Sequence, residues 1–361
     1  MRAFMFSIGL VAAVTAAAAQ KPATGTKPWV APGTPGSPIN GELFHAQVLL
    51  DTAGFSAGVI DGKKGTSFAE AVKGFQEANG LQVTGKLDQP TRVALLRQNR
   101  QSTVYVKLTG DDVSRPFVYP FPKKPEDQAK LKFMGYRNML EKVAERYHTT
   151  PQTVVALNGP DKLIGPGQTL RLPNVVPASR DYGGAINDEQ TQLMNMLNVA
   201  GDQPKGDFIV VDKSDGTLRV YRSGGDPSGQ SEKTKSGKSP SVPTGTLIAQ
   251  FPVTTGSGHD PLPLGTWKTT TYSFLPPFNY QPDLFWDVAD DKAEQKLPPG
   301  PNGPVGVAWL DLTKEHYGIH GTNEPQTIQH TESHGCLRLT NWDVMRLSRM
   351  MKPGFTAYFV V

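Results

Sequence analysis

Cysteine is almost absent from this sequence: its 361 residues contain one, Cys336. A single cysteine cannot form an internal disulfide, and structural zinc sites usually contain paired Cys-x-x-Cys motifs, so neither is expected to stabilise the fold. A zinc site made from His320, His334 and Cys336 would lack an evident fourth ligand. Cys336 is therefore an inert buried thiol, an intermolecular bridge or a reactive thiol.

Concentrated charge of one sign is also missing. The 37 Lys and Arg nearly balance the 33 Asp and Glu, for a net charge of +4, and no basic cluster predicts nucleic-acid binding. A Gly-x-Ser-x-Gly nucleophile elbow is absent, which disfavours a serine hydrolase. Gly237-Lys238-Ser239 resembles the last three residues of a phosphate-binding loop, but Glu232 occupies the position of the first glycine of that motif. A nucleotide site is therefore not predicted.

Long apolar runs are confined to the first nineteen residues. Arg2 precedes an apolar run at 3–13, and Ala17-Ala18-Ala19 follows, a pattern typical of a secretory signal peptide cleaved after Ala19. A membrane anchor is the alternative, but the run is shorter than the roughly 20 residues that cross a bilayer. Residues 1–19 are thus predicted to be a signal peptide and the Pro- and Gly-rich residues 20–37 a flexible linker.

The 37 Gly and 31 Pro predict many turns and argue against an all-helical chain. Residues 38–100 nevertheless favour a small all-α domain, with apolar residues near helical spacing at 43–53, 68–75 and 91–96. This segment resembles the peptidoglycan-binding type 1 domain through Gln47-x-Leu49-Leu50, Ile60-Asp61-Gly62, Ala71-Val72-x-x-Phe75-Gln76 and Thr84-Gly85. It departs from that pattern at Lys63-Lys64-Gly65, where the family usually has one residue before the glycine.

Residues 101–176 predict a small α+β segment, with strands at 104–108 and 169–172 and helices at 139–147 and 151–157. Residues 136–174, with Ala144-Glu145-Arg146-Tyr147-His148, Leu157-Asn158, Gly167-Gln168 and Pro173-Asn174, resemble a LysM-like segment. Glycan binding and a purely structural insert both remain open for it. His148 is predicted to be an ordinary surface or helix-end histidine. Residues 177–206 are predicted to be a linker with one amphipathic, packing stretch at 188–199.

Residues 207–361 predict a mainly β domain. Strands are expected at 208–212, 218–221, 246–254, 266–272, 304–312, 316–321 and 355–361, with a helix at 341–351. Residues 273–303 are rich in proline and aromatic residues, including Trp286. A loop of that length is typical of a lid or a substrate-binding wall, although plain packing is the alternative.

Four of the seven histidines lie within the twenty residues before Cys336: His316, His320, His330 and His334. A thiol is a weak nucleophile near neutral pH, and a nearby histidine can activate it as a base. Spacing alone leaves open which histidine does so. His334 is two residues from the thiol, whereas His320 ends a predicted strand that an antiparallel neighbour would bring level with Cys336.

The residues around the thiol predict supporting roles. Gly321 and Gly335 let backbone N–H groups approach a substrate and, with the Cys336 amide, hold an oxyanion. Ser333 is expected to support the turn. Arg338 is expected to bind a carboxylate or steady the turn.

Ile319-His320-Gly321-Thr322 and Ser333-His334-Gly335-Cys336-Leu337-Arg338-Leu339 resemble the signature of YkuD-type L,D-transpeptidases. The resemblance covers residues 207–361 and implies a sandwich-like β domain with a helix after the catalytic cysteine. It also implies that Cys336 attacks the third residue of a tetrapeptide stem and expels D-Ala. His320 would be the base, oriented by the Gly321 carbonyl. His334 would help to stabilise the oxyanion.

The same resemblance places Arg338, Thr322, Tyr317 and Trp286 in the substrate-binding site and implies no cofactor and no metal. The expected product is a 3-3 cross-link or a protein anchored to the wall, with an amine of a stem peptide or of an outer-membrane protein as acceptor. Carboxypeptidase trimming and a non-catalytic wall-binding protein are the alternatives. The expected location is exported, periplasmic and wall-associated.

Overall fold

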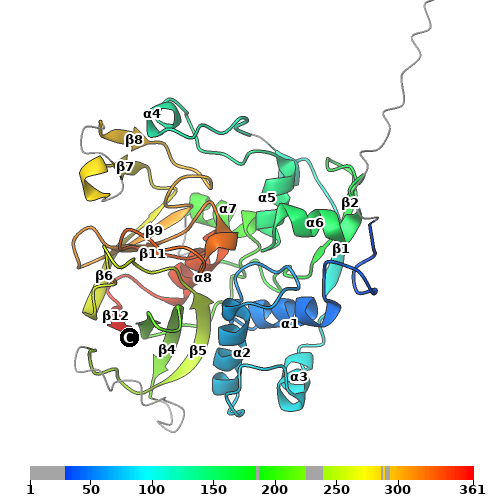
Figure 1. Cartoon of the computed structure of the whole chain (residues 1–361), viewed down its shortest axis with the longest axis horizontal. Coiled ribbons are helices and arrows are strands. Elements are labelled where there is room, and N and C mark those ends of the chain that lie inside the picture. The colour runs from blue at the N-terminus through cyan, green and yellow to red at the C-terminus, as the bar shows by residue number, and fades with distance from the viewer. Residues whose placement is uncertain (1–28, 115, 184–186, 225–238, 286–287, 289–292) are drawn as a thin grey trace, which may run out of the picture.

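A computed structural model gives the structure of the chain, and it describes residues 29–114, 116–183, 187–224, 239–285, 288 and 293–361 (Figure 1). The predicted signal peptide and the first part of the predicted linker lie outside these described residues. Within the described part of the chain, no helix is long and apolar enough to cross a membrane.

The N-terminal module is helical, as predicted. It contains α1 (Gly41–Thr52), α2 (Thr66–Ala78) and α3 (Gln89–Leu96). The side chains of Asn40 and Asp88 accept hydrogen bonds from backbone N–H groups at the starts of α1 and α3. Helix α2 ends just before Gly80, whose φ of +63° is easily adopted only by glycine.

The second module combines a two-stranded antiparallel sheet with short helices. Its strands are β1 (Thr103–Lys107) and β2 (Thr169–Pro173), and its helices are η1 (Asp111–Val113), α4 (Pro125–Gln128), α5 (Met139–Arg146) and α6 (Pro151–Asn158). Its hydrophobic core also contains Phe44, Val48 and Ile60 of the N-terminal module. The two modules therefore share one core and pack as a unit.

The third module is mainly β, as predicted. Its strands are β3 (Phe208–Asp212), β4 (Thr217–Ser223), β5 (Gly245–Pro252), β6 (Gly265–Phe274), β9 (Ala308–Leu312), β10 (Gly318–His320), β11 (Leu337–Arg338) and β12 (Thr356–Val360). They form one curled eight-stranded sheet in the order β11-β10-β9-β6-β12-β3-β4-β5. The predicted sandwich-like packing is thus made by a single sheet.

Two helices fill the core of this sheet. Helix α8 (Asn341–Met350) follows the site cysteine, as predicted, and buries Trp342 completely. Helix α7 (Asp188–Met196) packs against α8 and contributes the buried Leu193 and Met194. The predicted amphipathic stretch at 188–199 therefore belongs to the core of the β module, although residues 177–206 were expected to be a linker.

A separate small sheet pairs β7 (Phe278–Tyr280) with β8 (Gln295–Leu297), and η3 (Pro282–Leu284) follows β7. Both strands come from the segment that was predicted to form a lid or wall. Helix α4 of the second module contacts β8. In Figure 1 these elements lie together at one end of the molecule.

The three modules meet at a buried ionic cluster. Asp51 of α1 accepts two hydrogen bonds from the Arg346 guanidinium of α8, at 2.7 and 2.9 Å. His148, just after α5, lies 3.0 Å from the same carboxylate and stacks on Trp342. Burial alone would raise the pKa of Asp51, but Arg346 and His148 outweigh it and hold that pKa well below its usual value.

Of the two positions predicted for His148, a surface and a helix end, the surface position is wrong. The residue does follow a helix end, but its side chain is completely buried. Its Nε2 is 2.7 Å from the carbonyl oxygen of Leu197, so each ring nitrogen faces an acceptor from a different module. The imidazole of His148 can be buried because Asp51 and the Leu197 carbonyl, both distant in sequence, replace its hydrogen bonds to water.

Candidate active site

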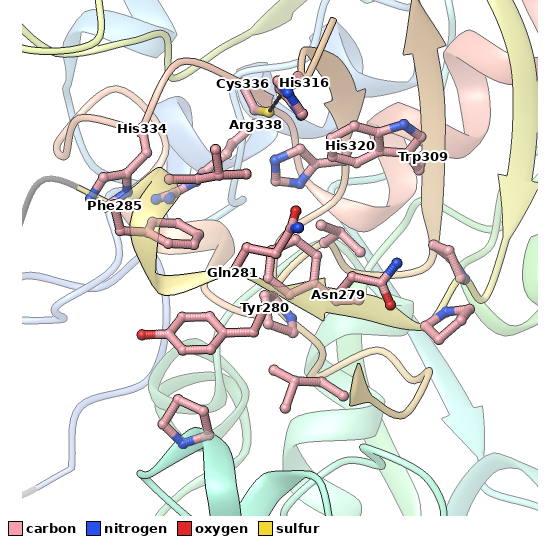
Figure 2. A pocket seen from close by; sticks show the side chains of 18 of the residues that line it. Asn279, Tyr280, Gln281, Phe285, Trp309, His316, His320, His334, Cys336 and Arg338 are labelled. Carbon is pink, nitrogen blue, oxygen red and sulfur yellow. Dashed lines mark hydrogen bonds between the residues drawn. The ribbon is translucent and has the colours of Figure 1, made fainter. Parts of the chain in front are cut away.

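A cavity of about 700 Å³ opens beside the single cysteine (Figure 2). One part of its wall comes from the curled sheet and carries Cys336, His320 and Trp309. The opposite part comes from the segment that contains β7 and η3, including Asn279 and Phe285. Cys336, His320, His334, Arg338 and Tyr317 of the predicted site all line this cavity.

Cys336 lies one residue before β11 with a partly exposed thiol. Its S–H donates to the His316 carbonyl oxygen at 3.5 Å, the interaction drawn in Figure 2. Burial raises the pKa of the Cys336 thiol, and the Gly318 backbone hydrogen bond and the nearby Arg338 oppose this only in part. The resting sulfur is therefore a thiol, which needs a base to become a good nucleophile.

The turn before Cys336 is tight. Gly335 has a φ of +103°, and a side-chain carbon there would come within 2.9 Å of the Tyr317 ring. Glycine is needed for both reasons. Ser333 is buried and its hydroxyl donates to the Cys336 carbonyl at 2.6 Å, a contact of the kind expected for a residue that supports the turn.

The strand arrangement that was expected to place His320 is wrong. Strand β10, which ends at His320, pairs with β11 in parallel, with His320 opposite Arg338. A parallel pair needs a crossover, and residues 321–336 provide it, including the short η4 helix (Pro325–Thr327). His320 and Cys336 thus lie at opposite ends of one crossover segment, both facing the cavity.

His320 is held in one orientation. Its ring stacks on Trp309, with centroids 5.3 Å apart and planes 13° apart, and its Nδ1 lies 2.7 Å from the Gly321 carbonyl oxygen. Because a carbonyl can only accept, Nδ1 carries the hydrogen and the lone pair is on Nε2. This is the contact with Gly321 that the family resemblance implies.

The environment keeps the His320 imidazole neutral. Burial lowers its pKa to about 3, with a further contribution from the Arg338 cation, while the Gly321 hydrogen bond opposes the shift. A neutral imidazole that shares a cavity with a protonated thiol has a lone pair that can accept a proton.

Behind His320 lies a polar network that sequence reasoning missed. The side-chain oxygen of Asn341, at the start of α8, accepts from Val307 N–H at 3.1 Å and lies where a side chain at Gly321 would be. Its amide nitrogen donates to Glu145 at 2.8 Å, and Glu145 also accepts from the Tyr136 hydroxyl. The second module therefore supports the turn that orients His320.

His334 lies apart from His320. Its ring meets the Phe285 ring edge to face, with centroids 4.9 Å apart. In Figure 2 this pair lies at the left, His320 and Trp309 at the right, and Cys336 at the top. Both histidines thus line the cavity that holds Cys336: the Gly321 contact fixes the tautomer of His320, and His334 lies beside the aromatic wall.

The predicted substrate-binding residues separate into two groups. Arg338 and Tyr317 line the cavity. Thr322 does not: it is buried, and its hydroxyl accepts from Glu324 N–H at 3.2 Å in a local turn. Trp286 lies outside the described residues. Pro125 and Gln128 of α4 also line the cavity, and no motif in the sequence marks them.

Two family models match the chain. One, described as the YkuD L,D-transpeptidase catalytic domain, matches residues 206–360; the other, described as "Putative peptidoglycan binding domain", matches residues 41–95. Two proteins named "Putative L,D-transpeptidase YkuD", from Bacillus licheniformis and Bacillus subtilis, are 50% identical over 56 and 54 residues. These alignments cover 16% and 15% of this chain, and only 34% and 33% of the relatives' lengths.

Solved structures are similar at a lower level. L,D-transpeptidase 3 from Mycobacterium tuberculosis, in complex with a faropenem-derived adduct, is 16% identical, with a TM-score of 0.28 over 43% of this chain and 60% of that one. An L,D-transpeptidase from Xylanimonas cellulosilytica is 12% identical, with a TM-score of 0.33 over 93% of this chain and 98% of that one.

Proposed function

We propose that this chain is a cysteine acyltransferase that remodels peptidoglycan, since residues 206–360 match the L,D-transpeptidase catalytic domain and residues 41–95 match a peptidoglycan-binding domain. The observation that carries this proposal is the sole cysteine, which shares a cavity with a neutral, oriented His320. The substrate is a tetrapeptide stem.

The reaction has two half-steps. As the Cys336 sulfur attacks the carbonyl of the third stem residue, Nε2 of His320 takes the thiol proton. The peptide bond to the terminal D-Ala breaks, and the imidazolium returns the proton to the leaving amine. An amine then attacks the thioester, loses its proton to His320, and releases Cys336 as a thiol.

The oxyanion of each tetrahedral intermediate needs donors. The backbone N–H of Cys336, freed by the turn at Gly335, is the first candidate, and His334 on the same cavity is the second. Arg338 provides a cation for a stem carboxylate, because it lines the cavity and has no ion-pair partner among the described residues.

The favoured product is a 3-3 cross-link or an anchored protein. A wall-binding module in the same chain supports transfer to an amine that is held nearby, on a second stem or on an outer-membrane protein. The signal-like residues 1–19 support export to the periplasm and association with the wall. Hydrolysis of the thioester would instead give carboxypeptidase trimming.

The product decides between transfer and trimming. We expect purified protein incubated with disaccharide-tetrapeptide to release D-Ala and form dimers, and Cys336→Ala to form none. Tripeptide monomers without any dimer would overturn the transferase and support trimming. A Ser102→Ala variant is the matched control, because Ser102 lies in the second module and does not line the cavity.

The alternative of a non-catalytic wall-binding protein has a separate test. Carbapenems are acyl mimics, so a working thiol is expected to gain one carbapenem mass at Cys336. A protein that binds peptidoglycan but remains unmodified would support the non-catalytic alternative and contradict the proposed reaction.

A further inference from the structure

A second cavity, of about 390 Å³, lies where the three modules meet. We call it the junction cleft. Its walls include Lys63, Lys64 and Ser67 of the N-terminal module, Gln152 of α6, and Gln326 and His330 of the crossover segment. None of its lining residues lines the catalytic cavity. The reaction described above leaves this cleft without a role.

Residues 57–59 line the cleft, and hydrogen bonds on both sides of this loop tie it to the other two modules. Ser56 N–H donates to the Gln250 carbonyl at 2.9 Å, and Ile60 N–H donates to the His148 carbonyl at 2.8 Å. The Thr149 hydroxyl donates to the Ile60 carbonyl at 2.5 Å. A ligand would therefore meet walls that are already in position, which lowers the entropic cost of binding.

Gln47 fixes the loop that carries the two lysines. Its side-chain oxygen accepts from the N–H groups of Asp61 and Gly62, at 3.0 and 2.7 Å, and its amide nitrogen donates to Asp61. The loop that follows presents Lys63 and Lys64 to solvent. This is the position where the sequence has one residue more before glycine than the family pattern.

The lysine and carboxylate side chains that line the cleft are Lys63, Lys64 and Asp61, two cations and one anion. Lys63 is paired with Asp61 at 3.5 Å. Lys64 has no carboxylate partner among the residues that the structure describes, and exposed His330 lies on the catalytic-domain side. Amide and hydroxyl groups of Gln152, Gln326 and Ser67 supply neutral hydrogen-bonding partners. A carboxylate next to hydroxyl or amide groups matches this arrangement.

The cleft and the catalytic cavity share one segment. Residues 325–330 lie in the crossover that begins after His320 and ends at Cys336. Gln329 anchors this segment to the sheet, because its N–H donates to the Thr254 hydroxyl at 2.9 Å. A ligand bound in the cleft would therefore contact this crossover segment. The proposed base, His320, and the proposed nucleophile, Cys336, lie at its two ends.

We propose that the junction cleft binds an uncross-linked stem peptide of peptidoglycan through its free carboxylates, while another stem occupies the catalytic cavity. This inference rests on the proposed function, since it assigns the cleft to the same polymer. It makes the cleft a second substrate site and gives Lys64 the specificity-determining charge.

Binding in the cleft is measured with the catalytic thiol removed or blocked, so that the probe is not consumed, and it is identified by its dependence on Lys64. The probe is disaccharide-tetrapeptide, titrated into full-length Cys336→Ala protein and into protein acylated with a carbapenem. We expect Lys64→Glu to weaken binding of this probe about fivefold, both in the Cys336→Ala protein and in the acylated protein. The loss of affinity is expected to be larger at low salt than at high salt, because salt screens the charge. Lys86→Glu is the matched control, because Lys86 is exposed on the same module and lies outside the cleft.

Two further probes identify the recognised group. Disaccharide-tetrapeptide with amidated carboxylates is expected to bind like the Lys64→Glu variant, and glycan chains stripped of stems are expected to bind weakly. Equal affinity of Lys64→Glu and the parent, or of the amidated and free probes, would overturn the proposal. Tight binding of stripped glycan would do so as well, because it would assign the cleft to sugars.

The test of the cleft can fail while the test of the proposed reaction succeeds, and the reverse is also possible. Carbapenem acylation of Lys64→Glu is expected at the parental rate, since Lys64 does not line the catalytic cavity. Failure of the parent itself to acylate would contradict the proposed reaction, while the titrations of Cys336→Ala would still decide the role of the cleft.

Discussion

The pairing of a neutral imidazole with a protonated thiol is the chemical feature on which the proposed reaction depends. Burial acts on both groups in the direction that removes charge, lowering the pKa of His320 to about 3 and raising that of Cys336. The thiol proton then moves only as the sulfur attacks. This differs from cysteine enzymes in which the resting pair is a thiolate and an imidazolium.

The pH dependence of acylation tests this state. With a folded pKa of about 3, His320 is already neutral above pH 5, so no inflection is expected near 6.5. The rate is expected to be flat from about pH 5 to 8 and to rise as the thiol begins to ionise at higher pH. The measurement is the rate of carbapenem acylation followed by intact mass across the pH range.

An inflection near the ordinary imidazole pKa would contradict the neutral pair. His320→Gln is expected to lower the rate by about 10²- to 10⁴-fold, the usual effect of removing a general base. The control is His45→Gln, because His45 lies in α1, outside the cavity.

Glu145 is predicted to couple stability to pH. Burial raises its pKa to about 7 from 4.5, although the hydrogen bonds from Tyr136 and Asn341 oppose the shift. Between these two values the folded state binds more protons than the unfolded state, so this group stabilises the fold below pH 4.5 and its contribution is lost as pH rises through 7. The total is about 3 kcal/mol.

Glu145→Gln removes this titration. We expect the unfolding free energy of the variant to fall less than that of the parent between pH 4.5 and 7, as measured by urea unfolding at several pH values. Parallel curves for the two proteins would show that Glu145 is not the titrating group. Glu126→Gln is the control, since Glu126 lies in the short α4, which buries none of its residues.

At the scale of the elements, β10 positions the base through its neighbour β9. A side-chain carbon at Gly318 would overlap the Trp309 ring, which stacks on His320. Gly318→Ala is therefore expected to displace Trp309, cost about 1–3 kcal/mol of stability and slow acylation. Gly165→Ala, where the added carbon meets nothing within 4 Å, is the control. An unchanged acylation rate for Gly318→Ala would show that the stacking does not position His320.

Sequence patterns predicted individual strands well and their pairing less well. The continuous apolar run at 208–212 between turn residues matches β3 at both ends. The parallel pairing of β10 with β11 was not predictable, because the irregular crossover hides the strand direction and β11 has only two residues. The Glu145 contact was equally hidden, because its partner Asn341 is 196 residues away.

At the scale of the whole molecule, the modules are joined by buried charges as well as by shared cores. His148 and Asp51 are 97 residues apart in sequence, and Arg346 is 295 residues from Asp51. No local pattern predicts such contacts, which is why His148 was expected to be an ordinary surface or helix-end histidine. The motif behind the family resemblance, by contrast, is local, and its Cys336, His320 and His334 line one cavity.

Asp51→Ala is predicted to destabilise this junction strongly. The change leaves the buried Arg346 without its main counterion, and breaking a buried pair in this way typically costs about 3–5 kcal/mol. Thermal unfolding measures the loss. Asp161→Ala, at an exposed position, is the control and is expected to have little effect. An unchanged midpoint for Asp51→Ala would contradict a junction that depends on this ion pair.

The central claim is that Cys336 forms a thioester with a tetrapeptide stem, and intact mass tests it most directly. Protein mixed with disaccharide-tetrapeptide and quenched in acid is expected to gain the mass of the stem donor minus D-Ala. Proteolytic mapping is expected to place the adduct on Cys336, and Cys336→Ala should show none. An adduct that persists in Cys336→Ala, or no adduct in the parent while D-Ala is released, would contradict the account.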